Sequence, residues 1–345
     1  MLFVTGKPSS LRAPAAIAIA ALALTASGPA SAGFTLKGRT VNIYIGGGIG
    51  GAIDAVGRTI LPYLARHLPG EPTVVAGNMP GSGGVQGAQY LFNVAARDGS
   101  AAGTINAGPL IDPLIRDGLG YDPRKFRWIG SLFKGDTVCS VWHLSPVKSI
   151  KDAQARDVPM ASTGATSTPL RSALLMNALI GTRFKPISGF DGGNALLAIE
   201  RGEVEGFCNQ LASQRMTRPQ WMKEGKLRPI VQISMTADPD YPDVPRAIDL
   251  IASAADRRVL EFYLLPWEIN HPFMLPPGAP DEAVAAWRAA FDKAVKDPGY
   301  LADAAARSQK IDPHGGEDVT RLVDQLFATP RDIIERTNAA TTPRP

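Results

Sequence analysis

Hydrophobic and polar positions along this chain follow two periods in alternation. Short runs rich in β-branched and aromatic residues, such as TVNIYI at 40–45 and PTVVAGN at 72–78, are typical of strands. Between these runs, apolar residues from Ile53 to Leu64 recur at the three- and four-residue spacing of a helix with one buried face. The pattern predicts a strand, a helix that begins at Ala52, and a second strand.

The same alternation continues toward the C-terminus. A helix is expected at 84–96 and a third strand at 100–108, and a second block with five further strands begins near Thr137. Strands that alternate with helices through short loops are typical of mostly parallel sheets covered by helices. We therefore predict an α/β fold with two lobes joined by a hinge. The first lobe takes residues 33–137 and 259–345, and the second takes residues 138–258.

The first 32 residues differ from the rest of the chain. Lys7 and Arg12 precede or open an apolar run, APAAIAIAALALTAS, that is too short to span a bilayer comfortably. Ala30 and Ala32 then occupy the small-residue positions of a signal-peptidase site. The pattern predicts a signal peptide at 1–32, cleaved near Ala32, and export to the periplasm. A retained membrane anchor is the alternative.

Net charge gives no support to a nucleic-acid partner. The whole chain carries 36 Lys and Arg against 32 Asp and Glu, for a net charge of +4. Removal of a leader with two basic and no acidic residues lowers that charge to +2. No run of Lys and Arg with interleaved aromatic residues occurs, so we expect no nucleic acid to bind.

Export also affects the two cysteines, Cys139 and Cys208. Disulfides form and persist in oxidising compartments such as the bacterial periplasm. A bond between the two would close a long loop and stabilise the fold by about 4 kcal/mol in the chain-entropy model. Two buried thiols are the alternative.

A glycine-rich loop follows the first predicted strand. Gly46, Gly48 and Gly51 match the spacing of a dinucleotide-binding fingerprint, which also needs an acidic residue at the end of the second strand. That strand ends in Gly77 and Asn78, so we expect no nucleotide. Open backbone N–H groups at a helix N-terminus suit a carboxylate instead. A plain tight turn is the alternative.

Similar small-residue loops follow other predicted strands, at 78–87, 162–169 and 189–195. Each offers glycines or hydroxyl groups at a strand-to-helix junction. Ligands of open α/β sheets bind at the carboxyl ends of strands, where helix N-termini point. Loops of this kind in both lobes predict an anion-binding cleft between them.

Catalytic and metal sites find little support. His67, His143, His271 and His314 show neither HExxH nor HxH spacing, and no G-x-S-x-G elbow is present. We therefore expect a binding protein without metal, cofactor or catalysis. Asp54 is open to two interpretations, a ligand contact or a charge that the helix N-terminus stabilises.

The order of these motifs resembles the Bug-type extracytoplasmic solute receptors of tripartite tricarboxylate transporters. The resemblance rests on GGGIGGAID with Arg58 one turn later, NMPGSGG, ARDGSAAGTI, STGATST and AIERGEVEGF, and it covers essentially the whole mature chain. It implies a type II, Venus-flytrap periplasmic-binding-protein fold with mixed sheets. It also implies a monomer that closes on a small organic acid and delivers it to membrane permease subunits. A periplasmic sensing subunit for a histidine kinase is the alternative, and the ligand's identity stays open.

The resemblance also implies which residues contact the ligand. The family turn is usually shorter and contains proline, so GGGIGGAID is expected to differ in shape, and the two cysteines suggest a divergent branch with a disulfide in lobe two. The implied contacts are Gly48, Ile49, Gly50, Gly51, Asp54, Gly81, Ser82, Gly83, Asn106, Thr163, Gly164, Thr166, Ser167, Phe190 and Asp191.

Overall fold

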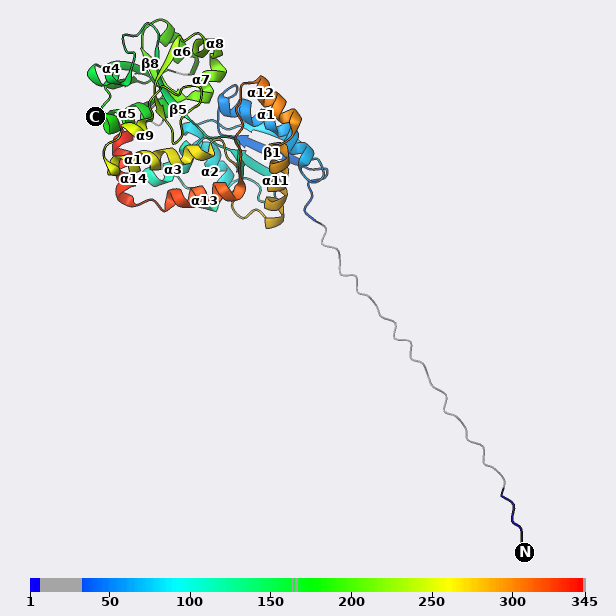
Figure 1. Ribbon diagram of the computed structural model, residues 1–345. Coiled ribbons are helices and arrows are strands. Elements are labelled where there is room, and N and C mark those ends of the chain that lie inside the picture. The colour runs from blue at the N-terminus through cyan, green and yellow to red at the C-terminus, as the bar shows by residue number, and fades with distance from the viewer. Residues whose placement is uncertain (7–32, 163, 165–166, 191, 344–345) are drawn as a thin grey trace. The chain divides into compact units, whose positions relative to one another are not determined.

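Strands and helices alternate along the chain in the computed structural model (Figure 1). The structure describes residues 1–6, 33–162, 164, 167–190 and 192–343. The predicted leader at 7–32 therefore lies outside the described residues, as do three predicted contacts, Thr163, Thr166 and Asp191. Phe34–Pro345 form one compact unit.

The first sheet has the strand order β11-β4-β10-β3-β1-β2. Its members are β1 (Thr40–Ile45), β2 (Thr73–Asn78), β3 (Ala101–Thr104), β4 (Arg127–Ser131), β10 (Phe273–Leu275) and β11 (His314–Gly315). β1 pairs in parallel with β2 and β3, as strands joined through helices do. β10 instead pairs antiparallel with both β3 and β4.

The second sheet has the order β7-β6-β8-β5-β9. Its members are β5 (Thr137–Trp142), β6 (Val158–Ala161), β7 (Phe184–Ile187), β8 (Gly206–Gln210) and β9 (Leu227–Ile233). β6 is parallel to β7 and β8, whereas β5 is antiparallel to β8 and β9. Two mixed sheets with helices confirm the predicted α/β class and the mixed sheets that the resemblance implies. The alternation of strands and helices had suggested mostly parallel sheets, and this was wrong because β5 and β10 run antiparallel to their neighbours.

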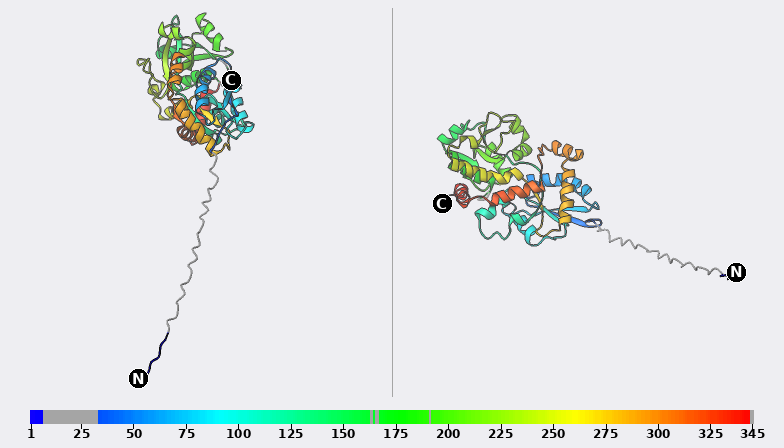
Figure 2. Two further views of the ribbon diagram at one scale, coloured as in Figure 1. Left: turned by 90° about the vertical axis from the view of Figure 1, so that its right-hand side faces the viewer. Right: turned by 60° about the horizontal axis from the view of Figure 1, so that its bottom comes forward.

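Helices cover these sheets, and their colours in Figures 1 and 2 follow the chain from blue to red. The helices are α1 (Ala52–His67), α2 (Val85–Asn93), α3 (Gly108–Ile115), α4 (Ile150–Ala155), α5 (Thr168–Ile180), α6 (Gly192–Glu200), α7 (Leu211–Thr217), α8 (Pro219–Lys223), α9 (Ala247–Leu250), α10 (Ala254–Leu264), α11 (Asp281–Ala294), α12 (Pro298–Ala306), α13 (Gly316–Phe327) and α14 (Arg331–Thr341). Short 3-10 helices occupy η1 (Ser82–Gly84), η2 (Pro123–Lys125) and η3 (Leu265–Ile269).

The predicted third strand was too long. β3 ends at Thr104, and α3 begins at Gly108 with a proline in its first turn and Pro113 inside it. Proline suits the first turn of a helix because its missing N–H has no intrahelical partner there.

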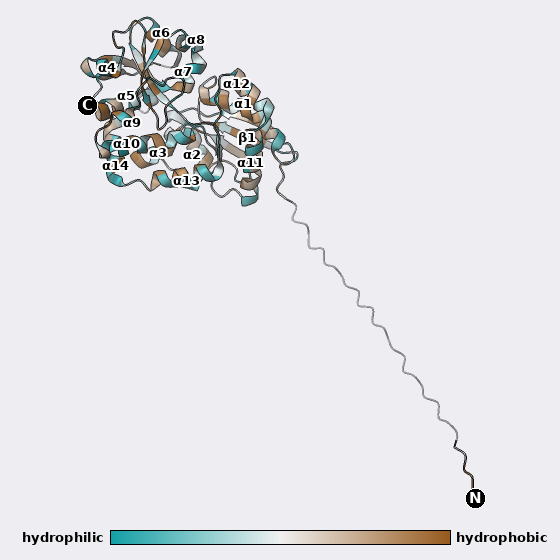
Figure 3. Ribbon diagram, viewed as in Figure 1, coloured by the Kyte–Doolittle hydropathy of each residue, from teal (hydrophilic) through white to brown (hydrophobic). Residues whose placement is uncertain are grey.

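Amphipathic faces hold the helices on the sheets. The predicted face of α1 is confirmed, since Ile53, Val56, Ile60 and Leu64 are each no more than 5% exposed. Each such side chain contributes about 1.5–3 kcal/mol by its burial. Most helices accordingly carry both hydrophobic and hydrophilic turns in Figure 3. Among the described residues, no helix has the length and apolar character needed to cross a bilayer.

The predicted disulfide is confirmed. Cys139 on β5 lies directly opposite Cys208 on β8, with an S–S distance of 2.06 Å and a Cα–Cα distance of 3.9 Å. Both residues are fully buried. The bond therefore ties neighbouring strands of the second sheet, two residues before β8 ends at Gln210.

Candidate functional site

A cavity of about 350 Å³ lies where loops from both sheets meet. We call its first-sheet side the first wall and its second-sheet side the second wall. The first wall consists of Gly47, Gly48, Gly51, Ala52, Ile53, Ser82, Gly83, Asn106, Gly108 and Asp112. The second wall consists of Ser167, Thr168, Pro169, Asn209, Gln210 and Ser213. Trp267 and His271, from the segment between α10 and β10, complete the lining.

Larger hollows occur elsewhere on the surface. One of about 490 Å³ lies among α7, α8 and residues 305–310, and another of about 590 Å³ lies around Arg124 and Arg288. Neither is lined by the glycine-rich loops at the carboxyl ends of the parallel strands, which is where α/β sheets bind ligands. We therefore take the smaller cavity between the walls as the candidate site.

The glycine loop after β1 forms the centre of the first wall. Gly50 adopts a φ of +75°, which a residue with a Cβ rarely adopts. Gly51 is the N-cap of α1 and offers no side chain to the first turn of that helix. The first N–H groups of a helix have no intrahelical partners, so they remain available to a ligand on the cavity side.

Asp54 holds this loop from behind and is only 4% exposed. One of its carboxylate oxygens accepts from Gly50 N at 3.0 Å, and the other accepts from Arg58 Nε at 2.7 Å and Asn78 Nδ2 at 2.8 Å. Asn78 Nδ2 also donates to the Gly47 carbonyl at 2.9 Å. The carboxylate thus positions the loop through donors that belong to the protein.

Charge in this network is stabilised by its hydrogen bonds. Burial raises the pKa of the Asp54 carboxyl, but the hydrogen bonds from Gly50, Asn78 and Arg58 outweigh burial and hold that pKa below its ordinary value. Asp54 is therefore ionised at neutral pH. Its interpretation as a charge near a helix N-terminus agrees with the structure, and its role as a ligand contact stays a prediction.

Two further loops pack against the first. A Cβ on Gly84 would lie 3.0 Å from the Gly46 carbonyl oxygen, and Gly84 has a φ of +105°, so this position favours glycine twice over. The close approach brings Ser82 and Gly83 beside the glycine loop. Asn106 follows β3 at the same edge of the sheet.

Side chains rather than backbone dominate the second wall. Ser167 is the N-cap of α5, where its hydroxyl accepts from Leu170 N at 3.4 Å and donates to the Gly164 carbonyl at 2.7 Å. Gln210 and Ser213 line the cavity and bring an amide and a hydroxyl group to its second wall.

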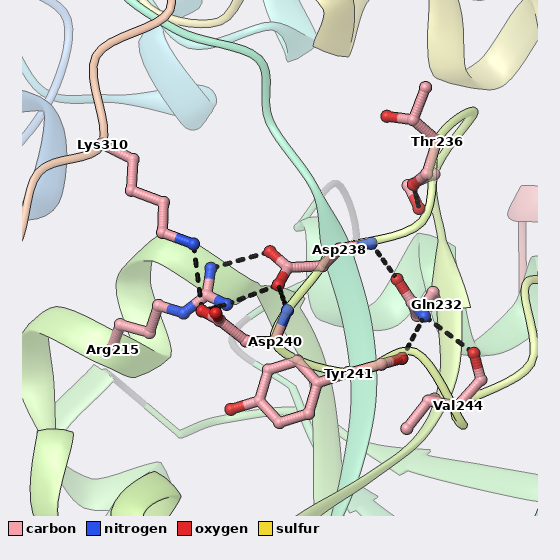
Figure 4. A network of polar contacts seen from close by, with 9 residues as sticks. Arg215, Gln232, Thr236, Asp238, Asp240, Tyr241, Val244 and Lys310 are labelled. Atoms are coloured by element: carbon pink, nitrogen blue, oxygen red, sulfur yellow. Dashed lines mark hydrogen bonds and ion pairs between the residues drawn. The ribbon is translucent and has the colours of Figure 1, made fainter.

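A polar network fixes α7, which carries Ser213 (Figure 4). Arg215 binds Asp238 through two hydrogen bonds of 2.9 and 2.8 Å and reaches Asp240 at 2.6 Å. Gln232 Oε1 accepts from Asp238 N at 2.8 Å, and Lys310 donates to Asp240 at 3.0 Å. Burial raises the pKa of Asp238, yet the bonds from Arg215 and Asp240 N hold it below its ordinary value. The network anchors α7 without entering the cavity.

One buried ion pair joins the two walls. Asp112 of α3 accepts from Arg171 Nη1 of α5 at 3.0 Å, and the two residues are 2% and 8% exposed. Burial raises the pKa of Asp112, although Arg171 and Arg116 oppose that rise. Asp112 lines the cavity, and its charge is already matched by Arg171.

The predicted site residues divide into three groups. Gly48, Gly51, Ser82, Gly83, Asn106 and Ser167 line the cavity. Thr163, Thr166 and Asp191 lie outside the described residues. The others are not lining residues in this structure, namely Ile49, Gly50, Asp54, Gly81, Gly164 and Phe190.

The residues outside the lining have other visible roles. Ile49 is 85% exposed at the tip of the glycine loop. Phe190 packs against the apolar cluster that contains Trp142 and Trp221. Asp112, Asn209, Gln210 and Ser213 were not predicted, although Asn209 and Gln210 end a predicted strand, which is a position that often carries ligand contacts. Within the described residues, no group of three His, Cys, Asp or Glu side chains could hold a metal ion.

Comparison with known proteins agrees with this geometry. The model of a family described as "Tripartite tricarboxylate transporter family receptor" matches residues 58–339. Its match begins at Arg58, one turn after Asp54, and runs through every strand of the second sheet. No curated protein matches the chain.

Solved structures share the fold at low sequence identity. The periplasmic binding protein BugD is 20% identical, with a TM-score of 0.67 over 89% of this chain and 99% of its own. MatC from Rhodopseudomonas palustris with bound malate is 22% identical, with a TM-score of 0.66 over 86% and 98%. A further R. palustris protein with adipate is 19% identical, with a TM-score of 0.65 over 88% and 98%.

Proposed function

The chain belongs to the receptor family of the tripartite tricarboxylate transporters, and from that premise we propose that it captures a small carboxylate for uptake by membrane permease subunits. Capture takes place in the periplasm, in the cavity between the two walls. The malate and adipate in two structures of the same fold support this class of ligand.

One observation carries the proposal. The cavity is lined by the starts of three helices, α1, α3 and α5, and by glycine-rich loops, while the lining residues that the structure describes include no Lys or Arg. Each helix N-terminus carries a partial positive charge of roughly half an elementary charge. Backbone N–H groups and these partial charges stabilise a carboxylate without a cationic side chain.

Binding and release follow from lobe motion. We propose that residues 33–137 with 259–345 and residues 138–258 move as the two lobes, with the carboxylate held between the first and second walls. The ion pair between Asp112 and Arg171 joins the two lobes in this conformation, so it has to break or rearrange when they separate. The receptor acts as a monomer, which light scattering of the mature chain would measure directly.

A cavity-filling variant tests the site. Gly48 lines the cavity, and a Cβ there meets no atom within 4 Å, so Gly48→Leu should fold normally and occupy the ligand's space. Gly77 is an exposed strand glycine with the same freedom and no place in the cavity, which makes Gly77→Leu the matched control. We expect that at least one organic acid raises the Tm of the wild type and of Gly77→Leu. The same acid should leave the Tm of Gly48→Leu unchanged.

Two outcomes would contradict the proposal. If no carboxylate stabilises the wild type, the proposed function is refuted. Equal stabilisation of Gly48→Leu would place the ligand elsewhere. Capture of membrane proteins on the ligand-loaded receptor then tests the partner: permease subunits support uptake, and a histidine kinase overturns it.

A further inference from the structure

His271 lies at the same edge of the first sheet as the glycine loops. β10 runs antiparallel to β3 with Phe273 opposite Thr104, so the residues just before Phe273 stand beside those just after Thr104. One of the latter is Asn106, which also lines the cavity. Since β3 lies between β1 and β10, His271 is two strand spacings, about 10 Å, from the glycine loop after β1.

The His271 side chain has polar capacity that the protein leaves unused. It is 2% exposed, and its Nδ1 is buried with no hydrogen-bond partner among the described residues. The ring packs edge-on against Phe133 with centroids 4.9 Å apart. Its backbone φ is +51°, a left-handed conformation that is uncommon outside glycine and that clusters at functional sites.

Burial favours the neutral form of the imidazole. It lowers the pKa of His271 to about 3. A neutral imidazole donates from one nitrogen and accepts at the other. It is therefore suited to an uncharged partner such as an amide or a hydroxyl group.

The cavity offers compensation for one negative charge. Among the described lining residues the only acidic one, Asp112, is already paired with Arg171, and none of them is a Lys or Arg. The three helix N-termini of the walls together carry roughly one and a half elementary charges, which compensates one carboxylate fully and a second only in part. A second carboxylate beside His271 would meet a neutral ring in an environment that already disfavours the charge of Asp112.

We infer that His271 contacts the ligand and selects an acid with a single carboxylate and, a few carbon atoms away, an uncharged hydrogen-bonding group. The spacing of about 10 Å, less a hydrogen bond of about 3 Å at either end, leaves roughly 4 Å or more between the two ligand groups. A chain of four to six carbon atoms meets that requirement. The inference rests on the proposed function and narrows the substrate class of the same cavity.

Isosteric ligand pairs test the class. Succinamate, glutaramate and adipamate differ from succinate, glutarate and adipate only in replacing one carboxylate with an amide. Titration calorimetry at pH 7 should find at least one monoamide that binds ten-fold or more tightly than its dicarboxylate. Tighter binding of the dicarboxylate in every pair overturns the inference while leaving the proposed function intact. Absence of binding by these six acids and by every other organic acid in the thermal screen removes the proposed function itself.

Variants of His271 test the contact. His271→Phe keeps an aromatic ring against Phe133 but has no polar atom, so we expect it to weaken the tightest-binding acid from the screen at least ten-fold. His271→Asn tolerates the left-handed backbone and keeps an amide, and it serves if the Phe variant fails to fold. The matched control is His143→Phe, since His143 packs on Trp142 in the second sheet and does not line the cavity. Unchanged affinity in both His271 variants overturns the contact.

Imidazole nitrogen signals give a readout that no structural role would move. The chain has four histidines, so each ¹⁵N signal can be assigned by single substitution. Ligand addition should shift the His271 nitrogens and leave those of His143 in place, with His271 neutral before and after. A His271 signal that stays fixed at ligand saturation contradicts the inference.

Discussion

The two walls of the cavity are fixed by different means. On the first wall, the Asp54 network bonds directly to the glycine loop, through Gly50 N and the Gly47 carbonyl via Asn78. On the second wall, the Arg215 network holds α7 from behind, and a disulfide holds the strand that precedes it. The first wall therefore presents backbone groups whose positions depend on an ion pair, while the second presents side chains on a scaffold anchored at a distance.

Because of this difference, variants at the two walls should affect folding stability and ligand affinity in different proportions. A change in the first-wall network should alter both, because the network contacts the ligand-facing loop. A change in the second-wall anchors should alter stability most. The following variants test whether the two walls differ in this way.

Loss of the disulfide should have the largest effect on stability. Cys139→Ala with Cys208→Ala opens a loop with a sequence separation of 69 residues and should lower the free energy of unfolding by about 4 kcal/mol. Urea denaturation measures this, and reductant should destabilise the wild type but not the variant. Unfolding curves that coincide for variant and wild type would contradict the anchoring role.

Asp238→Asn should have the second largest effect on stability. Its side chain is 6% exposed and is bound twice by Arg215, so losing the charge should cost about 3 kcal/mol, in the range for breaking a buried pair. Ligand affinity, measured by calorimetry, should change less than three-fold. Glu335→Gln is the control, because its partner Arg331 is 90% exposed and exposed ion pairs contribute little to stability. A ten-fold loss of affinity in Asp238→Asn would show that the walls are not separable in this way.

Asp54→Asn should lower stability by about 2 kcal/mol, since hydrogen bonds to a charged group weaken. Affinity should also fall by ten-fold or more as Gly50 and Gly47 lose their fixed positions. Asp297→Asn is the control: Asp297 caps α12, its pKa is likewise held low, and it lies outside the cavity. Stability loss with unchanged affinity in Asp54→Asn would assign Asp54 to the fold alone.

Substitution of Asp136, in the connection between β4 and β5, should raise stability rather than lower it. Burial, with Asp238 and Glu268 nearby, raises the pKa of Asp136 to about 6. The folded protein therefore holds this proton more tightly than the unfolded chain, so stability falls as the pH rises from about 4 to about 6. Asp136→Asn should stabilise the protein by about 1–2 kcal/mol at pH 7.5, after discounting for partial exposure, and by little near pH 4. Destabilisation by this variant at pH 7.5 would refute the expectation.

The smallest effect should come from the second wall's helix cap. Ser167→Ala removes the N-cap hydroxyl of α5 and should cost about 1 kcal/mol. Chemical denaturation resolves a change of this size. Because the hydroxyl bonds within its own loop, affinity should change by less than the ten-fold loss expected for Asp54→Asn.

The same contrast explains which site residues could be predicted from the sequence. The loop after β1 was predicted from its glycines because its chemistry is local, and Ser167 was found in the same way. Asp112, Ser213 and His271 carry no local signal, since their places depend on how α3, α7 and β10 pack. His271 was considered only for metal and catalytic sites, and its isolation in the sequence says nothing of the antiparallel strand that brings it beside Asn106.

The prediction of the fold class depended less on how individual elements pack. Strand and helix periods predicted β1, α1 and β2 closely. The antiparallel directions of β5 and β10 were not predicted, because hydrophobic period reports a strand and not its partner.

A crystal structure of the mature chain with its tightest-binding carboxylate tests the central claim most directly. The account predicts carboxylate oxygens within about 2.7–3.2 Å of backbone nitrogens at Gly48–Ile53 or Ser82–Gly83, directly or through one water, with second-wall side chains on the other side. A carboxylate bound outside the cavity, or held by Lys or Arg side chains, would contradict it.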